Sequence, residues 1–251
     1  MTSTVLSERK NGVRILTLNR PERLNAISVD LVEDLCAALS DALADQTSRV
    51  ILFKGAGRAF CSGDDLKDFG NQSGSEAAAR RFLKNLQDVS RLIVLGEKVV
   101  IGAVHGWAVG GGFEWLVNCD IVLMADGTRC FFPETQFGMV VTGGVTALLP
   151  RVVGEQRARA LMLSGERIDA GKAHSLGLAW RVMPEDRLFS EAQSYAERLS
   201  EMPVRGLTDT KRLSRRIDRE AFETALKLEA EAVLEAFLDP STASRMVKTK
   251  E

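Results

Sequence analysis

The sequence predicts an α/β protein in which parallel strands alternate with helices, followed by a helical C-terminal region. Two observations carry this prediction: short apolar strands separated by stretches of helical periodicity, and the loss of strand patterns after about Leu188. The strand–helix–strand order favours a layered domain with parallel pairing. The expected strands are Val13–Leu18, Val50–Phe53, Val99–Val104 and Ile121–Met124.

The first strand and helix have clear boundaries. Apolar and polar residues alternate over Val13–Leu18, and the breaker Asn19-Arg20-Pro21 follows. Ser28 is a suitable N-cap for a helix because apolar residues recur after it at helical spacing. These residues are Leu31, Val32, Leu35, Ala38, Leu39 and Ala42.

The middle strands alternate with loops and a longer helix. Val50–Phe53 is followed by the loop Gly55–Gly57, and helical periodicity returns from about Ser75 to Leu95. Val99–Val104 is almost continuously apolar, so we expect helices on both of its faces.

The C-terminal region is predicted to be helical. Pro203 and Pro240 punctuate it. We therefore divide the chain into a core domain at 1–190, which holds the site, and a helical region at 191–251. The expected helices span residues 190–200, 203–217 and 219–238.

Composition excludes several classes of protein. The chain has 251 residues, 45% of them hydrophobic and 27% charged, which suits one large domain or one domain with an appendage. Its net charge of −1 gives no sign of a nucleic-acid or anionic-membrane partner. No apolar stretch has the ~18 residues of a membrane helix. Residues 1–5 have neither a basic start nor an apolar core, so we expect no signal peptide.

The cysteines and histidines argue against a metal or a nucleophilic triad. The only histidines are His105 and His174, and the cysteines form no Cys-x-x-Cys pair. We therefore expect no metal site, and a triad with a histidine base is disfavoured. Scattered thiols are typical of a reducing, cytoplasmic location. The cysteines are Cys36, Cys61, Cys119 and Cys130.

Gly106–Glu114 is the first unusual segment, with three consecutive glycines directly after an apolar strand. Each glycine costs roughly 1 kcal/mol inside a regular element, so bare backbone must be needed there. A strand, then glycines, then a helix over Phe113–Asn118 presents free N–H groups at a helix N-terminus. A flexible turn is the plain alternative, and a dinucleotide-binding turn lacks its Gly-x-Gly-x-x-Gly pattern. An oxyanion or phosphate cradle fits best.

Glu114 and Glu134 are candidate acid–base residues. Asp126-Gly127 lies between two short strands and predicts a hairpin-like reversal. That reversal would return Glu134 toward Asn118, about 6 Å along the helix axis from Glu114. Both carboxyls have apolar sequence neighbours, which would raise a carboxyl pKa and suit general acid–base work.

Four segments in register resemble the crotonase superfamily of enoyl-CoA hydratases and isomerases. Asn19–Ala26 is similar to its early Asn-Arg-Pro…Asn-Ala signature. Ala59–Leu66 and Val104–Gly112 resemble its first and second oxyanion-hole segments. Phe132–Gly138 resembles the segment that carries the second catalytic acid.

The resemblance implies a fold, a reaction and site residues. The fold would be a crotonase-like spiral of ββα units with a helical C-terminal trimerisation region, giving homotrimers or dimers of trimers. The N–H groups of Asp64 and Gly111 would hold the thioester oxygen. Glu114 and Glu134 would add water across the double bond of a 2-enoyl-CoA.

The resemblance also implies how the substrate binds. The substrate is a coenzyme A thioester, and no metal or redox cofactor is expected. The expected CoA and substrate contacts are Arg23, Ala59, Asp64, Asp65, Leu66, Lys67, Gly110 and Gly111.

This chain departs from the family pattern at several positions. Val141 stands where many family hydratases have proline, and Thr142 where glycine is common. Both belong to the loop that shapes the acyl pocket, so the acyl group stays open. The side chain of Asp64 occupies an oxyanion position often held by a small or apolar residue, and residues 239–251 match the usual family ending poorly.

Alternatives stay open within and beyond this family. One glutamate suffices for an enoyl-CoA isomerase, and decarboxylase, hydrolase or lyase chemistry occurs on the same scaffold. A different class is RNA binding, because one helix would present a single basic face. Whole-chain charge argues against it, and the plain interpretation is a solvated or subunit-facing surface. The basic residues are Lys211, Arg212, Arg215, Arg216 and Arg219.

Overall fold

A six-stranded sheet forms the centre of the computed structural model, which describes residues 3–216 and 219–248. The strand order is β1-β2-β3-β4-β6-β9, and every neighbouring pair is parallel except β1 and β2. The register places Val50 opposite both Val13 and Val99. The strands are β1 (Val5–Lys10), β2 (Val13–Leu18), β3 (Val50–Gly55), β4 (Val99–Val104), β6 (Ile121–Ala125) and β9 (Arg181–Met183).

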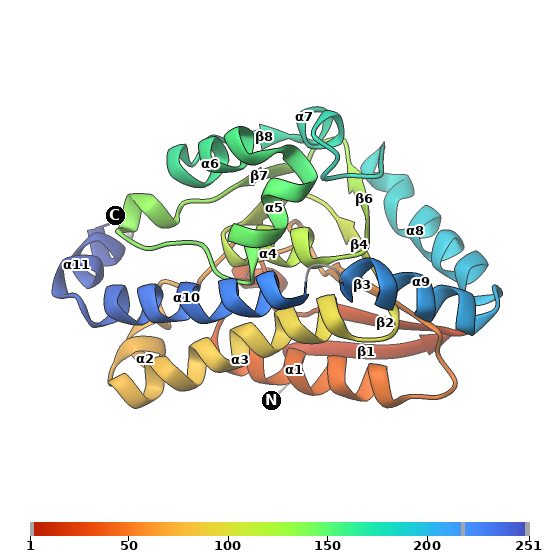
Figure 1. The fold of residues 1–251 in the computed structure, drawn as a ribbon, viewed down its shortest axis with the longest axis horizontal. Coiled ribbons are helices and arrows are strands. Elements are labelled where there is room, and N and C mark those ends of the chain that lie inside the picture. Colours follow the sequence, from red (N-terminus) through yellow and green to blue (C-terminus); the bar gives the residue numbers. More distant parts are fainter. Residues whose placement is uncertain (1–2, 217–218, 249–251) are drawn as a thin grey trace.

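Helices cover both faces of this sheet (Figure 1). Successive side chains of a strand point to opposite faces, so Leu16 and Phe53 pack toward α1 (Val29–Ala44) and α3 (Glu76–Leu95). Their neighbours on the other face, such as Leu52, pack toward α8 (Glu185–Ser200). The apolar pattern of the strands follows from this double cover, as predicted.

A second, three-stranded sheet completes the spiral. It contains β5 (Trp107–Val109), β7 (Arg129–Phe131) and β8 (Ile168–Asp169). β4 and β5 precede α4 (Gly111–Asn118), and β6 and β7 precede α5 (Val145–Val153). Each unit therefore places one strand in each sheet and then a helix. β4 is parallel to β6 and β5 to β7, which is the expected repetition of ββα units.

The Asp126-Gly127 turn does not form the predicted hairpin. The N–H of Thr128 donates to the carbonyl of Ala125 at 3.1 Å, so the chain does turn there. However, β7 pairs with β5 and β8 rather than with β6. The reason is that β4 and β9 occupy both edges of β6, which leaves no edge for a hairpin partner.

The C-terminal region is helical, as predicted, and folds back over the core. Helix α10 packs across α3 and α5 (Figure 1). The boundary expected at residue 190 lies inside α8, and the division into two domains stays a prediction. The remaining elements are η1 (Pro21–Arg23), α2 (Phe69–Ser73), η2 (Glu134–Phe137), α6 (Glu155–Ser164), α7 (Ala170–Ser175), α9 (Val204–Arg216), α10 (Arg219–Leu238) and α11 (Pro240–Lys248).

Candidate active site

The glycines that open α4 allow very close contacts. Gly110 has φ 52° and ψ −123°, a conformation that side chains disfavour. A Cβ there would lie 2.7 Å from Oε1 of Glu134, and one on Gly112 would lie 2.6 Å from the Cβ of Cys61. The glycines therefore let the start of α4 touch two other segments of the site, which a merely flexible turn would not require.

The loop that follows Cys61 lies against this turn. The N–H of Cys61 donates to the carbonyl of Trp107 at 2.9 Å, and its carbonyl accepts from the N–H of Val109 at 3.0 Å. These bonds attach the loop to β5. As a result Asp64 and Gly111 line the same cavity, although they are far apart in sequence.

The backbone N–H groups of Asp64 and Gly111 suit an oxyanion hole. Gly111 is the first residue of α4, so its N–H has no acceptor within the helix. Outside helices and strands, neither N–H is a donor in the backbone hydrogen bonds between described residues. The N-terminus of α4 also favours negative charge on a bound oxygen. The pairing of these two groups on one ligand oxygen stays a prediction.

Glu114 is a buried acid held by a single residue. Its side chain is 2% exposed. The N–H of Thr142 donates to its Oε1 and the Thr142 hydroxyl bonds its Oε2, each at 2.6 Å. Burial raises the pKa of Glu114 to about 8, although the bonds from Thr142 act in the opposite direction. Burial therefore favours the protonated form of this carboxyl.

Glu134 is buried beside it with one oxygen unoccupied. It begins η2, directly after β7, and is 8% exposed. Its Oε2 has no hydrogen-bond partner among the described residues. Burial and then the charge of Glu114 raise the pKa of Glu134 well above its ordinary value. The two acids share one pocket, as predicted, but Glu134 reaches it through the second sheet and lies by Gly110 rather than near Asn118.

Asp64 contributes a third carboxyl to the same cavity. Burial and the neighbouring Asp65 raise the pKa of Asp64 to about 6. The charge of Asp64 in turn raises the pKa of both Glu114 and Glu134. Asp64 therefore adds negative charge beside the two glutamates of this cavity.

Apolar side chains enclose the acids. The cavity between them holds about 20 Å³, close to the space for one water molecule. Helix α3 supplies one wall and α10 supplies the cover through Val233 and Phe237. The lining residues are Asp64, Phe82, Leu83, Leu86, Gly111, Glu114, Glu134, Met139, Val140, Thr142, Val233 and Phe237.

Asp65 anchors the loop predicted to contact CoA. Its buried carboxylate binds Arg20 at 3.0 Å and Arg23 at 2.8 Å, and accepts the N–H of Lys67 at 3.1 Å. Burial acts to raise the pKa of Asp65, but the two arginines outweigh it and the pKa is lowered. This side chain is engaged inside the protein, so it holds the loop in place.

The other predicted CoA residues differ in accessibility. Lys67 is exposed, and Arg23 and Leu66 are half-buried. Ala59 is fully buried, and its carbonyl accepts a hydrogen bond from Asn25 at 2.8 Å. Within this set, Arg23 and Lys67 therefore carry the cationic groups that a CoA phosphate could reach.

The loop predicted to shape the acyl pocket holds Glu114, and its role in acyl binding stays a prediction. Val141 and Thr142 are both buried, and Thr142 lines the cavity. Sequence reasoning missed the hydrogen bonds from Thr142 to Glu114. The departure from the family's glycine at this position was the available signal, since only a side chain adds a hydroxyl there.

Residues of α10 were also missed. Val233 and Phe237 close the cavity, and Glu229 is 4% exposed on the same helix. The sequence indicated only that residues 219–238 form a helix. Nothing in the sequence indicated which other segment this helix would cover.

The predicted single basic face is wrong. Lys211 is 5% exposed, pairs with Asp120 at 2.7 Å and donates to two backbone carbonyls. Arg215 also pairs with Asp120, at 3.4 Å. Arg219 lies on a different helix, α10. Lys211 and Arg215 therefore pack against the core, where the half-buried carboxylate of Asp120 binds both of them. The side chain of Arg216 lies outside the described residues.

The histidine and thiols near the site are structural. His105 is fully buried, and its Nε2 lies 2.8 Å from the carbonyl of Gly57. Burial raises the pKa of Cys61 to about 12, so its thiol is not ionised at neutral pH. Within residues 3–216 and 219–248 no group of His, Cys, Asp or Glu is arranged to hold a metal ion. No helix in that part of the chain is long and apolar enough to cross a membrane.

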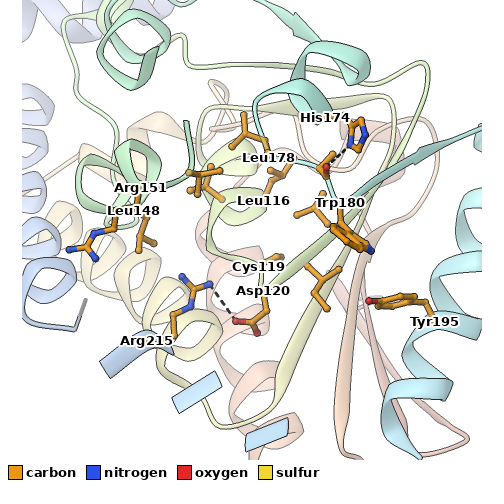
Figure 2. Close-up of a pocket in the computed structure, with 16 residues that line it drawn as sticks. Leu116, Cys119, Asp120, Leu148, Arg151, His174, Leu178, Trp180, Tyr195 and Arg215 are labelled. Atoms are coloured by element: carbon orange, nitrogen blue, oxygen red, sulfur yellow. Dashed lines mark hydrogen bonds and ion pairs between the residues drawn. The ribbon is translucent and has the colours of Figure 1, made fainter. Parts of the chain in front are cut away.

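A much larger cavity lies away from these acids. It holds about 650 Å³ between α4, α5 and the segment before β9, and Trp180, Tyr195 and Arg215 are among its lining residues (Figure 2). None of Asp64, Gly111, Glu114 or Glu134 lines it. The chemistry expected from the sequence is therefore confined to the smaller cavity under α10.

A model of the enoyl-CoA hydratase/isomerase family matches residues 8–245. The chain belongs to this family. It is 36% identical to the 1,2-epoxyphenylacetyl-CoA isomerase of Escherichia coli (strain K12) over 234 residues, which is 91% of this chain and 88% of the relative. It is 33% identical to the mitochondrial enoyl-CoA hydratase of Pongo abelii over 192 residues, or 76% of this chain and 65% of that protein.

Solved structures of the enoyl-CoA hydratase/isomerase family agree with the fold. A crystal structure from Mycobacterium paratuberculosis superposes with a TM-score of 0.93, at 28% identity and 99% coverage of both chains. One from Pseudoalteromonas atlantica gives 0.88 at 32% identity, covering 98% of this chain and 96% of the other. The predicted crotonase-like fold is confirmed, and family enzymes act on acyl-CoA substrates.

Proposed function

We propose that this protein is an enoyl-CoA hydratase that adds water across the 2,3 double bond of a 2-enoyl-CoA. The observation that carries the proposal is the pair of buried glutamates, Glu114 and Glu134, on one cavity of about 20 Å³ beside the N-terminus of α4. That cavity has the size for one water molecule. The reaction needs no cofactor besides the CoA of the substrate.

The two glutamates divide the proton transfers of hydration. One ionised carboxylate accepts a proton from water as the water oxygen bonds to the β-carbon. The other, protonated carboxyl donates its proton to the α-carbon. Two neighbouring buried carboxyls disfavour a second negative charge, so one keeps its proton as the donor while the other, ionised, is the acceptor. The assignment of either role to a particular glutamate is left to the kinetics of variants.

Backbone donors stabilise the charge that develops on the thioester oxygen. Asp64, in the loop after Cys61, and Gly111, the first residue of α4, both line the cavity, and their N–H groups are the proposed donors. Fixed donors in a dry site lower the barrier by about 3–4 kcal/mol each. Arg23 and Lys67 are proposed to bind the CoA phosphates, and the family resemblance supports assembly as homotrimers or dimers of trimers.

A second candidate is an enoyl-CoA isomerase that moves the double bond with one glutamate. Thr142 occupies both oxygens of Glu114, whereas Oε2 of Glu134 has no partner among the described residues. Glu134 alone would then remove a proton at one carbon and return it two carbons away. A relative in Escherichia coli is a 1,2-epoxyphenylacetyl-CoA isomerase, so isomerisation of a CoA thioester, although of an epoxide, occurs among similar proteins.

Hydration is tested with crotonyl-CoA and a longer 2-enoyl-CoA, followed as loss of the enoyl thioester absorbance. Glu114→Gln and Glu134→Gln keep the side-chain shape and remove acid–base function. We expect each to lower kcat by about 10²-fold or more. Glu231→Gln, at an exposed position on α10, is the control and should match the wild type.

Isomerisation is tested in parallel with a 3-enoyl-CoA. If wild type isomerises this substrate and does not hydrate the other two, and only Glu134→Gln abolishes the activity, the isomerase replaces the hydratase. Inactivity of wild type on all three substrates would reject both candidates. Full hydratase activity in Glu114→Gln would reject the two-glutamate mechanism.

A further inference from the structure

One face of α10 carries a single buried charge in an apolar stripe. The stripe packs inward onto α3, α5 and the candidate site. Glu229 is 4% exposed within it. A buried carboxylate is strongly unfavourable unless hydrogen bonds satisfy it, so its position requires a reason. The stripe consists of Phe222, Leu226, Glu229, Val233 and Phe237.

Glu229 caps the N-terminus of α5 from a different helix. The N-cap of α5 is Gly144, which has φ 73° and no side chain to accept the first N–H groups. The Gly144 N–H donates to one oxygen of Glu229 at 2.7 Å. The N–H and hydroxyl of Thr146 donate to the other oxygen, at 2.9 and 2.6 Å. The helix N-terminus further favours a negative charge here.

The same short segment holds Glu114. Thr142, two residues before Gly144, donates both its N–H and its hydroxyl to the Glu114 carboxyl. Between them, the carbonyl of Gly143 accepts the side-chain amide of Asn118 at 2.9 Å. Segment 142–146 is therefore fixed on one side by α4, which carries Glu114, and on the other by Glu229.

We propose that Glu229 is a positioning residue for Glu114. By pinning Gly144 and Thr146, it sets where Thr142 presents the two donors that orient the Glu114 carboxyl. The proposal rests on the proposed catalytic role of Glu114. Misplacing a catalytic group by about 1 Å can lower the rate by about 10²-fold.

Two changes remove the cap to different degrees. Glu229→Gln keeps the shape but turns one acceptor into a donor that faces another donor. Thr146→Val removes one of the three hydrogen bonds to Glu229. Thr146 is exposed, so this change leaves the buried face of α10 unaltered. We expect kcat with crotonyl-CoA to fall by about 10-fold to 10²-fold in the first and by a smaller factor in the second. The matched control, Glu231→Gln on the same helix, should have wild-type kcat.

The decisive comparison repeats Glu229→Gln in the Glu114→Gln background. A residue that acts through Glu114 has no further effect on kcat once Glu114 is gone. An equal fall in both backgrounds would overturn the positioning role and leave the proposed function intact. Full activity of Glu114→Gln alone would instead reject the proposed function.

A crystal structure of Glu229→Gln gives a readout that needs no substrate. We expect the Thr142 hydroxyl and the Glu114 carboxyl to separate beyond hydrogen-bonding distance, from 2.6 Å in the wild type. Retention of both Thr142 bonds at wild-type distances would overturn the proposal whatever the activity.

Discussion

Substituting Gly110 separates backbone strain from damage to the catalytic pair. Gly110→Ala places a Cβ in a conformation with φ 52° and ψ −123°. Such conformations cost about 1–3 kcal/mol for a residue other than glycine. The new Cβ would lie 2.7 Å from Oε1 of Glu134, whereas ordinary contact begins at 3.4 Å. The carboxyl must therefore retreat by roughly 0.7 Å.

Gly154 provides a matched control for this experiment. It also has a positive φ, 85°, with ψ 151°, but a Cβ there would meet nothing within 4 Å. Gly154→Ala should therefore lose about the same 1–3 kcal/mol of unfolding free energy without moving any catalytic group. Gly110→Ala should lose that stability and, in addition, about 10-fold to 10²-fold in kcat because Glu134 is displaced.

The assay combines urea unfolding with kcat on the best enoyl-CoA substrate. The reasoning is refuted if Gly110→Ala keeps wild-type kcat, because the close approach of Glu134 would then be irrelevant to catalysis. It is also refuted if Gly154→Ala loses as much kcat as Gly110→Ala. Backbone strain alone would then explain both results.

Three further predictions concern the buried carboxyls. Asp64→Asn removes a negative charge that raises the pKa of Glu114 in the same cavity. The limb of the pH–rate profile governed by Glu114 should therefore move to lower pH. A limb at the same or a higher pH would contradict this. Thr142→Val removes a hydrogen bond that lowers the pKa of Glu114, so that pKa should rise in carboxyl difference infrared spectra, and a fall would contradict it. The pKa of Glu114 is about 8 in the folded state against an ordinary 4.5, so the unfolded state loses this proton first as the pH rises. The free energy of unfolding should therefore decline between pH 4.5 and 8, by at most about 1.4 kcal/mol per pKa unit. Urea unfolding at pH 6 and 9 should show a smaller decline in Glu114→Gln, and parallel declines would count against the assignment.

The sequence predicted the four central strands of the main sheet and the glycine turn of the site, but not the edge strands β1 and β9, because the signals of the predicted parts are local. Val99–Val104 is apolar throughout since helices cover both of its faces. Three consecutive glycines at Gly110–Gly112 indicate by themselves that the backbone comes too close to other atoms there for a Cβ. These features need no knowledge of distant contacts, so residue type and spacing were sufficient.

The remaining features depend on contacts between distant segments. β5, β7 and β8 are only 2 or 3 residues long, too short for an alternating pattern. Asp126-Gly127 correctly predicted a turn. The strand after it, β7, could not pair with β6 because β4 and β9 occupy both edges of β6. Glu229 resembles any glutamate on an amphipathic helix, and only the packing of α10 on α5 reveals its role.

The cover formed by α10 has a consequence for the order in which the protein matures. A ribosome makes the chain from its N-terminus, so Asp64, Glu114 and Glu134 exist before Val233 and Phe237 are added. Until then the cavity lacks its cover from α10, so the burial that raises the pKa of these acids is incomplete. The site therefore has its full acid–base character only once α10 has docked.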